Sequence, residues 1–153
     1  MVSEDVVLLE KRKAGFGEFY KALLPGLVEF VGQMGINPAH EVLKRAEQFA
    51  PLLDRALRDM AVADAQDRSW LIMRMGYFIG EFFVQKYGGC WYVNEVPGSR
   101  YFARYVVGKF SKLSNAASML DPFHVAQVYA DSPVPRGLEK LLSEVDAELA
   151  KSK

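Results

Sequence analysis

The stretch "GYFIGEFFVQKYGGCWYV", from Gly76 to Val93, decides the fold, because its pattern changes partway along. Up to Tyr87 its residues are mostly aromatic or aliphatic, and in a helix they would cover nearly every side. Two glycines follow, and either Gly88 or Gly89 can adopt the left-handed conformation that ends helices. Residues typical of strands come next. The stretch therefore predicts a largely buried helix that runs directly into a β-strand.

A β-hairpin is predicted over residues 90–107, "CWYVNEVPGSRYFARYVV". Both halves are rich in β-branched and aromatic side chains, and Pro97-Gly98 suits the central positions of a type II turn. A short third strand is predicted around residues 117–120. Cys90 is the one cysteine of the chain, so no intramolecular disulfide can form. We expect it to be a small buried hydrophobic residue.

The residues before this stretch predict two helices. The first begins near Ser3, a suitable N-cap, and Pro25 predicts either a kink or a division into two shorter helices. Asn37-Pro38 is expected to open the second helix, with the asparagine as cap and the proline in the first turn. Pro51 is expected to bend this second helix.

Capping residues predict the remaining helix boundaries. Asp67 is expected to cap the helix that ends near Tyr87, and Asp121-Pro122 to open a short helix that ends near Tyr129. Spaced leucines over 138–149 predict a terminal amphipathic helix. Residues 1–153 are thus predicted to form one α+β domain, with a helical N-terminal half packed against a small antiparallel β-hairpin or sheet, and C-terminal helices.

The composition limits the classes of function. Of the 153 residues 50% are hydrophobic, and 19 Lys+Arg balance 19 Asp+Glu. The chain lacks the basic excess typical of nucleic-acid binders, and no apolar run approaches the length of a membrane span. Its N-terminus has acidic residues before a short apolar run, unlike a signal peptide. We therefore expect a soluble cytoplasmic protein that binds neither nucleic acid nor membrane.

Glu81 is the one carboxylate in the opening stretch. On a helical wheel it shares a narrow polar seam with Arg74 and Gln85. Three interpretations stay open: a carboxylate solvated or paired with Arg100, Arg104 or a lysine; a buried carboxylate hydrogen-bonded to the hairpin; and a general acid/base or ligand-contacting group. Acid–base catalysis needs a second group within hydrogen-bond reach, and the sequence supplies no obvious one.

Two glycines of the same helix predict close packing. Gly76 and Gly80 lie four residues apart, and a glycine inside a helix costs about 1 kcal/mol relative to alanine. We therefore expect a neighbouring helix or the hairpin to lie close to this face.

A ligand pocket between the helix over 67–87 and the hairpin is one open alternative. We expect the pocket to be lined by Tyr77, Glu81, Trp91 and Arg104. With Arg100, these residues are the candidates for contact with a ligand or partner. His40 and His124 lack metal-ligand neighbours at helical spacing, so neither a metal nor another cofactor is predicted. No catalytic residue is assigned, although an enzyme that uses Glu81 remains open.

The opening stretch also carries a signature, G-x-F-x-G-E followed by GG-x-W, at Gly76, Phe78, Gly80, Glu81, Gly88, Gly89 and Trp91. It resembles the signature of small uncharacterised bacterial proteins in which such a helix runs into a strand. "DPFHV" at 121–125 and "GLEKLL" at 137–142 resemble the later part of that pattern. The resemblance thus covers the second half of the chain.

Some proteins of this appearance are immunity proteins, which bind and neutralise a toxin. The resemblance implies a non-enzymatic bacterial protein-binding module with a toxin-like protein as its partner. A small-molecule-binding protein and an enzyme remain the alternatives, and a homodimer is also open.

Overall fold

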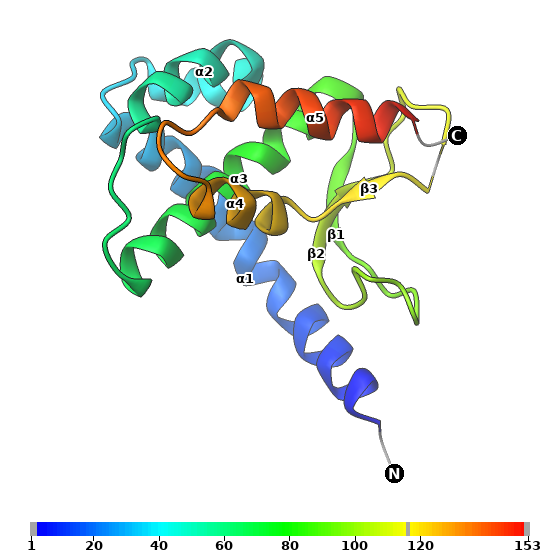
Figure 1. The fold of residues 1–153 in the computed structure, drawn as a ribbon. Coiled ribbons are helices and arrows are strands. Elements are labelled where there is room, and N and C mark those ends of the chain that lie inside the picture. Colours follow the sequence, from blue (N-terminus) through cyan, green and yellow to red (C-terminus); the bar gives the residue numbers. More distant parts are fainter. Residues whose placement is uncertain (1–2, 116, 152–153) are drawn as a thin grey trace.

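The computed structural model describes residues 3–115 and 117–151. Within these ranges the chain forms five α-helices, one 3-10 helix and a three-stranded antiparallel sheet (Figure 1). In chain order the elements are α1 (Glu4–Gln33), η1 (Ala39–Glu41), α2 (Val42–Leu57), α3 (Ala65–Tyr87), β1 (Cys90–Val93), β2 (Tyr105–Gly108), β3 (Met119–Leu120), α4 (Pro122–Asp131) and α5 (Leu138–Lys151). This confirms the predicted α+β fold, with a helical N-terminal half, a small sheet and C-terminal helices.

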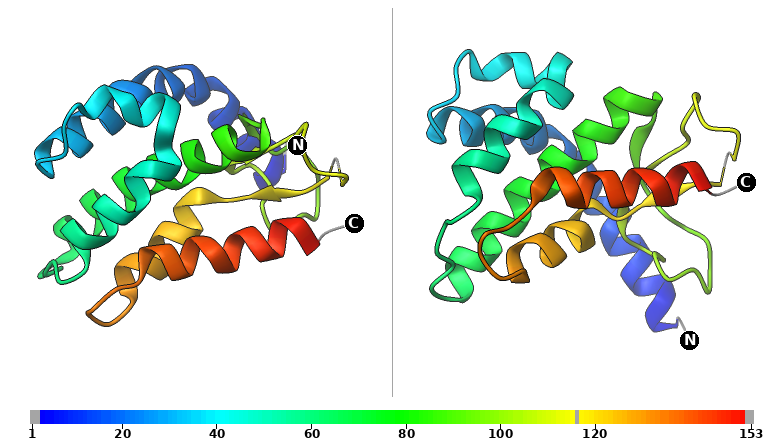
Figure 2. Two further views of the ribbon diagram at one scale, coloured as in Figure 1. Left: turned by 90° about the horizontal axis from the view of Figure 1, so that it is seen from above. Right: turned by 45° about the horizontal axis from the view of Figure 1, so that its top comes forward.

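Helix α3 is the centre of the fold. Figure 2 shows it (green) between α1 and α2 on one side and α4 and α5 on the other. It is covered on nearly all sides, which explains why its sequence is apolar all round. Its fully buried side chains include Leu71, Met75, Phe78, Ile79 and Phe83. Among the described residues, no helix has both the length and the apolar character that crossing a membrane requires.

The two ends of α3 differ in how well the sequence predicted them. Gly88 adopts the left-handed conformation, with φ 69° and ψ 43°, and ends the helix as predicted. The predicted cap at Asp67 is wrong. The N-cap is Asp64, whose carboxylate accepts a hydrogen bond from the Asp67 backbone N–H at 2.8 Å. Both residues suit a cap, and the helix simply begins one turn earlier.

Helix α1 is continuous over 30 residues, so the predicted division at Pro25 is wrong. Ser3 caps it as predicted, and its Oγ accepts a hydrogen bond from Val6 N at 3.2 Å. The side chains on both sides of the proline, Leu23 and Leu27, are fully buried, and this packing outweighs the lost helical hydrogen bond. The first turns of α1 project away from the rest of the chain (Figure 1).

Helix α2 begins and bends differently from the prediction. Asn37 does not cap it, because η1 lies between this residue and the helix, whose N-cap is Glu41. The irregular residue within α2 is Arg45, with φ −134° and ψ 42°, rather than Pro51.

Gln85 of α3 explains where α2 bends. In a regular helix Ala46 N would donate to Val42 O. Here the amide of Gln85 bridges the two groups: its Oε1 accepts from Ala46 N at 2.8 Å, and its Nε2 donates to Val42 O at 2.9 Å. A side chain inserted into the helical hydrogen-bond ladder is a known cause of kinks.

The hairpin is shorter than predicted. Val93 pairs with Tyr105, so β1 and β2 have four residues each and residues 94–104 form the connection. Pro97-Gly98 does form a turn, closed by a hydrogen bond from Ser99 N to Val96 O at 3.2 Å, but the turn lies within this loop. Ala103 has a φ of 60°, which strand residues do not adopt, and pairing stops there.

The sheet and the C-terminal helices otherwise follow the prediction. The short third strand pairs with β2 through Leu120 and Val107. Asp121 caps α4 as expected. Cys90 is exposed rather than buried, because it lies in edge strand β1 and it is the next residue, Trp91, that packs into the core.

Two buried polar side chains join α2 to α5. Asp54 of α2 accepts a hydrogen bond from Leu138 N, at the start of α5, at 2.9 Å. Arg136, just before α5, donates to the carbonyl oxygen of Met60 at 2.6 Å, beyond the end of α2. Each segment thus satisfies free backbone groups at the end of the other.

Candidate functional site

Glu81 is buried and bonded to the sheet. Its side chain is 8% exposed, and its Oε2 accepts a hydrogen bond from Trp91 Nε1 at 2.9 Å. Burial raises the pKa of the Glu81 carboxyl, and the Trp91 hydrogen bond partly opposes that rise. This geometry corresponds to the second interpretation, a carboxylate that ties the helix to the hairpin. The described residues show no ion pair between Glu81 and an arginine or lysine.

Gly76 and Gly80 of α3 make room for aromatic rings, in keeping with the predicted close packing. A Cβ at Gly80 would lie 1.9 Å from Cζ2 of Trp91, and a Cβ at Gly76 would lie 2.2 Å from Cδ1 of Phe123. Both distances are far below any real contact. Glycine at these positions therefore lets β1 and α4 pack directly on the backbone of α3.

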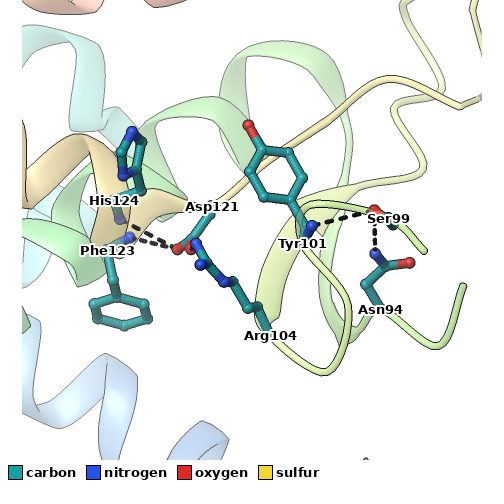
Figure 3. A network of polar contacts seen from close by, with 7 residues as sticks. All are labelled: Asn94, Ser99, Tyr101, Arg104, Asp121, Phe123 and His124. Atoms are coloured by element: carbon teal, nitrogen blue, oxygen red, sulfur yellow. Dashed lines mark hydrogen bonds and ion pairs between the residues drawn. The ribbon is translucent and has the colours of Figure 1, made fainter. Parts of the chain in front are cut away.

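Arg104 belongs to a different network from Glu81 (Figure 3). Its Nη1 donates to Oδ2 of the buried Asp121 at 2.9 Å. The other oxygen of Asp121 accepts from the backbone N–H groups of Phe123 and His124, at 3.0 and 3.2 Å. Asp121 therefore caps α4 and holds Arg104 at the same time, while the Arg104 side chain remains half exposed.

The loop that leads to Arg104 is ordered by its own hydrogen bonds. Ser99 Oγ accepts from the backbone N–H of Tyr101 at 3.1 Å, and Asn94 Nδ2 donates to the same oxygen at 3.1 Å (Figure 3). The guanidinium of Arg100 lies 4.6 Å from the ring centroid of Tyr101. Arg100 is thus an exposed part of this loop and lies apart from Glu81.

Tyr77 faces α1 rather than the hairpin. A Cβ at Gly26 of α1 would lie 3.1 Å from its ring. Partial burial raises the pKa of the Tyr77 hydroxyl, and the nearby Arg74 guanidinium partly opposes that rise. The five predicted candidates therefore occupy three places: a buried pair, an ordered loop that ends in the Asp121 network, and the contact between α1 and α3.

One open depression lies between α1, α3, the start of β2 and α4. It has a volume of about 390 Å³. It is lined by Arg12, Phe19, Met73, Arg104, Tyr105, Asp121, Phe123, His124 and Gln127. Of the predicted candidates it contains Arg104.

The floor of this depression is aromatic. The ring of Phe19 lies 4.4 Å from that of Tyr105 and 5.8 Å from that of Phe123, measured between centroids. The buried ring of Trp91 contacts both Phe19 and Phe123, at 5.5 and 5.9 Å. The Glu81–Trp91 pair therefore supports the floor from inside, and neither residue lines the depression itself.

A second depression, of about 240 Å³, continues along α1. Its lining residues are Ala22, Gly26, Glu29, Phe30, Gln33, Met73, Arg74 and Tyr77. Met73 lines both depressions and is 43% exposed. Together they form one surface that follows α1 from Arg12 to Gln33, and we call this surface the α1 groove.

The polar groups of the α1 groove are mostly hydrogen-bond donors. Arg12, Arg74 and Arg104 line it, against the carboxylates of Glu29 and Asp121. Asp121 already accepts from Arg104 and from two backbone N–H groups, so it is poorly suited to take a proton from a ligand.

Sequence patterns could not reveal the α1 groove, because its residues come from four segments of the chain. Within the described ranges, no cluster of three or more His, Cys, Asp or Glu side chains is arranged to hold a metal ion. Comparisons with protein-family models, with curated proteins and with solved structures find no match to this chain.

Proposed function

We propose that the chain is a cytoplasmic bacterial protein-binding module that acts without catalysis, of the immunity type that neutralises a toxin-like partner. The observation that carries this proposal is the composition of the α1 groove. Phe19, Tyr105 and Phe123 form its floor, the exposed Met73 lies at its middle, and arginines line it. Aromatic residues, methionine and arginine are the residues enriched in protein–protein interfaces.

The groove is also pre-organised. Asp121 holds Arg104, and the rings of the floor pack on one another and on Trp91. A surface that is ordered before binding loses less conformational entropy on association. This supports a role in tight recognition of a partner.

An enzymatic role for Glu81 has less support. Its carboxylate is buried, accepts the Trp91 hydrogen bond and lines neither depression. A general acid or base must come within hydrogen-bond reach of the substrate. We therefore assign Glu81 to the support of the groove floor.

Site-specific photo-crosslinking in the native host tests the proposal. A benzophenone amino acid is introduced at Met73 and, as the control, at Leu52 of α2, which is 40% exposed and lines neither depression. We expect the Met73 position, and not the Leu52 position, to capture one defined protein, identified by mass spectrometry.

The captured protein is then purified and its binding is measured. Met73→Asp should weaken binding at least about tenfold, or about 1.4 kcal/mol, while Leu52→Asp should leave it unchanged. Equal capture at the two positions, or equal binding by the two variants, would contradict a partner seated on the α1 groove.

A further inference from the structure

We propose that the end of the α1 groove between Arg12 and Arg104 binds a carboxylate of the partner, and that the partner presents an acidic segment with an aromatic or aliphatic residue beside the acid. This inference rests on the proposed function and names the chemistry that selects the partner.

Arg104 is the first of two guanidinium groups that serve this site. Within residues 3–115 and 117–151, the Arg104 side chain makes a single hydrogen bond, which Nη1 donates to Asp121. A guanidinium has five N–H donors in a planar fork, so further donors remain for a ligand. The half-exposed side chain lines the groove, and Asp121 fixes where it lies. An arginine held in this way recognises carboxylates with little loss of rotamer freedom.

Arg12 is the second guanidinium, and α1 brings it to the same end of the groove. The hydroxyl of Tyr105 donates to the backbone carbonyl oxygen of Arg12 at 2.8 Å, which joins this turn of α1 to the residue next to Arg104. The nearby acid Glu95 pairs with Lys13 at 3.4 Å. In the part of the chain that the structure describes, the Arg12 guanidinium has no ion pair.

The balance of charge favours an acidic ligand. Asp121 is neutralised locally by Arg104 and by the backbone N–H groups at the start of α4. The negative charge of Asp121 is therefore not available to Arg12, and the positive charge of Arg12 remains uncompensated. Arg74, which lies 4.9 Å from the centroid of the Trp70 ring, adds a further positive charge in the neighbouring depression, where the carboxylate of Glu29 opposes it. A basic segment would have to approach these three arginines, which disfavours it.

The floor of the groove supplies the other half of the recognition. The rings of Phe19, Tyr105 and Phe123 lie next to the two arginines, and Met73 continues the apolar surface. A carboxylate bound by the arginines would place the adjoining residue of the segment over these rings. The exposed side chains of His124 and Gln127 add polar contacts at the edge.

Binding of synthetic peptides tests this inference. The probe is a fluorescein-labelled 12-residue peptide of alternating Glu and Phe. The matched peptide carries Gln at each Glu position, and a third carries Lys. Fluorescence polarisation should show binding of the acidic peptide at least about tenfold tighter than that of the Gln peptide, and increasing salt should weaken it.

Three variants locate the effect. Arg12→Glu should weaken binding of the acidic peptide at least about tenfold and improve binding of the Lys peptide. Arg104→Lys, which keeps a positive charge beside Asp121 but loses the planar fork, should also weaken it. Arg55→Gln, at an exposed arginine of α2 outside the groove, should leave it unchanged. Because the Arg12 side chain is exposed and has no hydrogen bond or ion pair within the described residues, Arg12→Glu should keep the melting temperature.

The outcomes separate this inference from the proposed function. The inference is wrong if the Gln peptide binds as tightly as the acidic one, if Arg12→Glu has no effect, or if the acidic peptide does not bind at up to about 1 mM. The proposed function would then rest on the Met73 crosslink, and the partner would be recognised by groups other than a carboxylate. If the arginines select the acidic peptide but Met73 captures no protein in the host, the carboxylate site stands and the proposed function fails.

Discussion

The indole of Trp91 lies directly on Gly80, where a Cβ would come within 1.9 Å of its Cζ2. The same indole donates a hydrogen bond to Glu81, the next residue of α3, at 2.9 Å. One residue of β1 is thus held by two consecutive residues of α3, one through close contact and one through a hydrogen bond. These two contacts of Trp91 set where the sheet lies on α3. They therefore also set the position of the floor of the α1 groove.

Gly80→Ala should destabilise the protein although alanine is the better helix former. The new methyl group would overlap the buried indole, and overpacking of this kind costs about 1–3 kcal/mol or more. Gly17→Ala is the matched control, because Gly17 is also inside a helix and a Cβ there meets nothing within 4 Å. That substitution should stabilise by up to about 1 kcal/mol. Urea denaturation measures both; a Gly80→Ala protein as stable as the wild type would contradict the packing described.

Glu81→Leu and Glu81→Gln should have different effects on the free energy of unfolding. Leucine leaves the buried Trp91 N–H without an acceptor, which costs about 1–3 kcal/mol. Glutamine keeps an acceptor and removes the cost of burying a charge. At neutral pH, we therefore expect Glu81→Gln to be as stable as the wild type or more stable.

The pH dependence of stability gives a second test at Glu81. The pKa of this carboxyl is raised in the folded state, so the folded chain binds the proton more tightly than the unfolded chain. The resulting stabilisation is complete below the unfolded-state pKa and is lost as the pH rises through the folded-state pKa. Denaturation at several pH values should show this loss in the wild type but not in Glu81→Gln. If the stability of the wild type and of Glu81→Gln changed with pH in the same way, a raised pKa of Glu81 would be ruled out.

Tyr87 and Tyr129 should respond oppositely to replacement by phenylalanine. The Tyr87 hydroxyl donates to Asp146, whereas the buried Tyr129 hydroxyl has no hydrogen-bond partner among the described residues. Tyr87→Phe should therefore cost about 1 kcal/mol, and Tyr129→Phe should be neutral or stabilising. Thermal unfolding of both variants under one buffer condition checks the difference in sign.

Alkaline titration should reveal the same two tyrosines. Burial raises the pKa of each to about 12, and for Tyr87 the bond to Asp146 adds to the rise. Ionisation of either tyrosine thus disfavours the folded state, so the folding free energy is unaffected below the ordinary pKa of 10 and stability is lost as the pH rises through about 12. Tyrosinate absorbance of the wild type should show a late component that shrinks in each phenylalanine variant. A titration complete near the ordinary pKa would contradict this.

Gln85→Leu should destabilise the bend in α2. Leucine would leave Ala46 N and Val42 O without the bridge that they now share, at a cost of about 1–3 kcal/mol. Gln85→Glu keeps the acceptor for Ala46 N but not the donor for Val42 O, so an intermediate loss is expected. Amide hydrogen exchange at Ala46 should be faster in Gln85→Leu than in the wild type. Unchanged exchange would mean that α2 straightens and restores its own hydrogen bond.

The sequence predicted structure well where the cause lies within one turn of the chain. Ser3 and Asp121 cap helices with their own side chains, and Gly88 ends α3 because its backbone reaches the left-handed region. The predicted division of the first helix at Pro25 failed because packing opposed it. Leu23 and Leu27 keep α1 continuous past Pro25.

The candidate site was predictable only in part. Glu81 stood out as a lone acid in an apolar stretch, and its hydrogen bond to the hairpin was one of three interpretations. Arg104 was also singled out, but its partner Asp121 was expected only to cap a helix. Nothing in the sequence singled out Arg12 or Met73, because the sequence around an exposed arginine or methionine of a helix is the same with or without a groove beside it.

By itself, then, the sequence determined the α+β class, the junction between helix and strand at the Gly88-Gly89 pair, and the need for close packing at Gly76 and Gly80. These features follow from backbone conformation and side-chain periodicity, which act over a few residues. Only the tertiary structure decided that α2 bends at Arg45 and that Arg12 and Arg104 lie at one end of a groove. Such contacts join segments far apart in the chain, and their geometry is set by how the helices pack against α3.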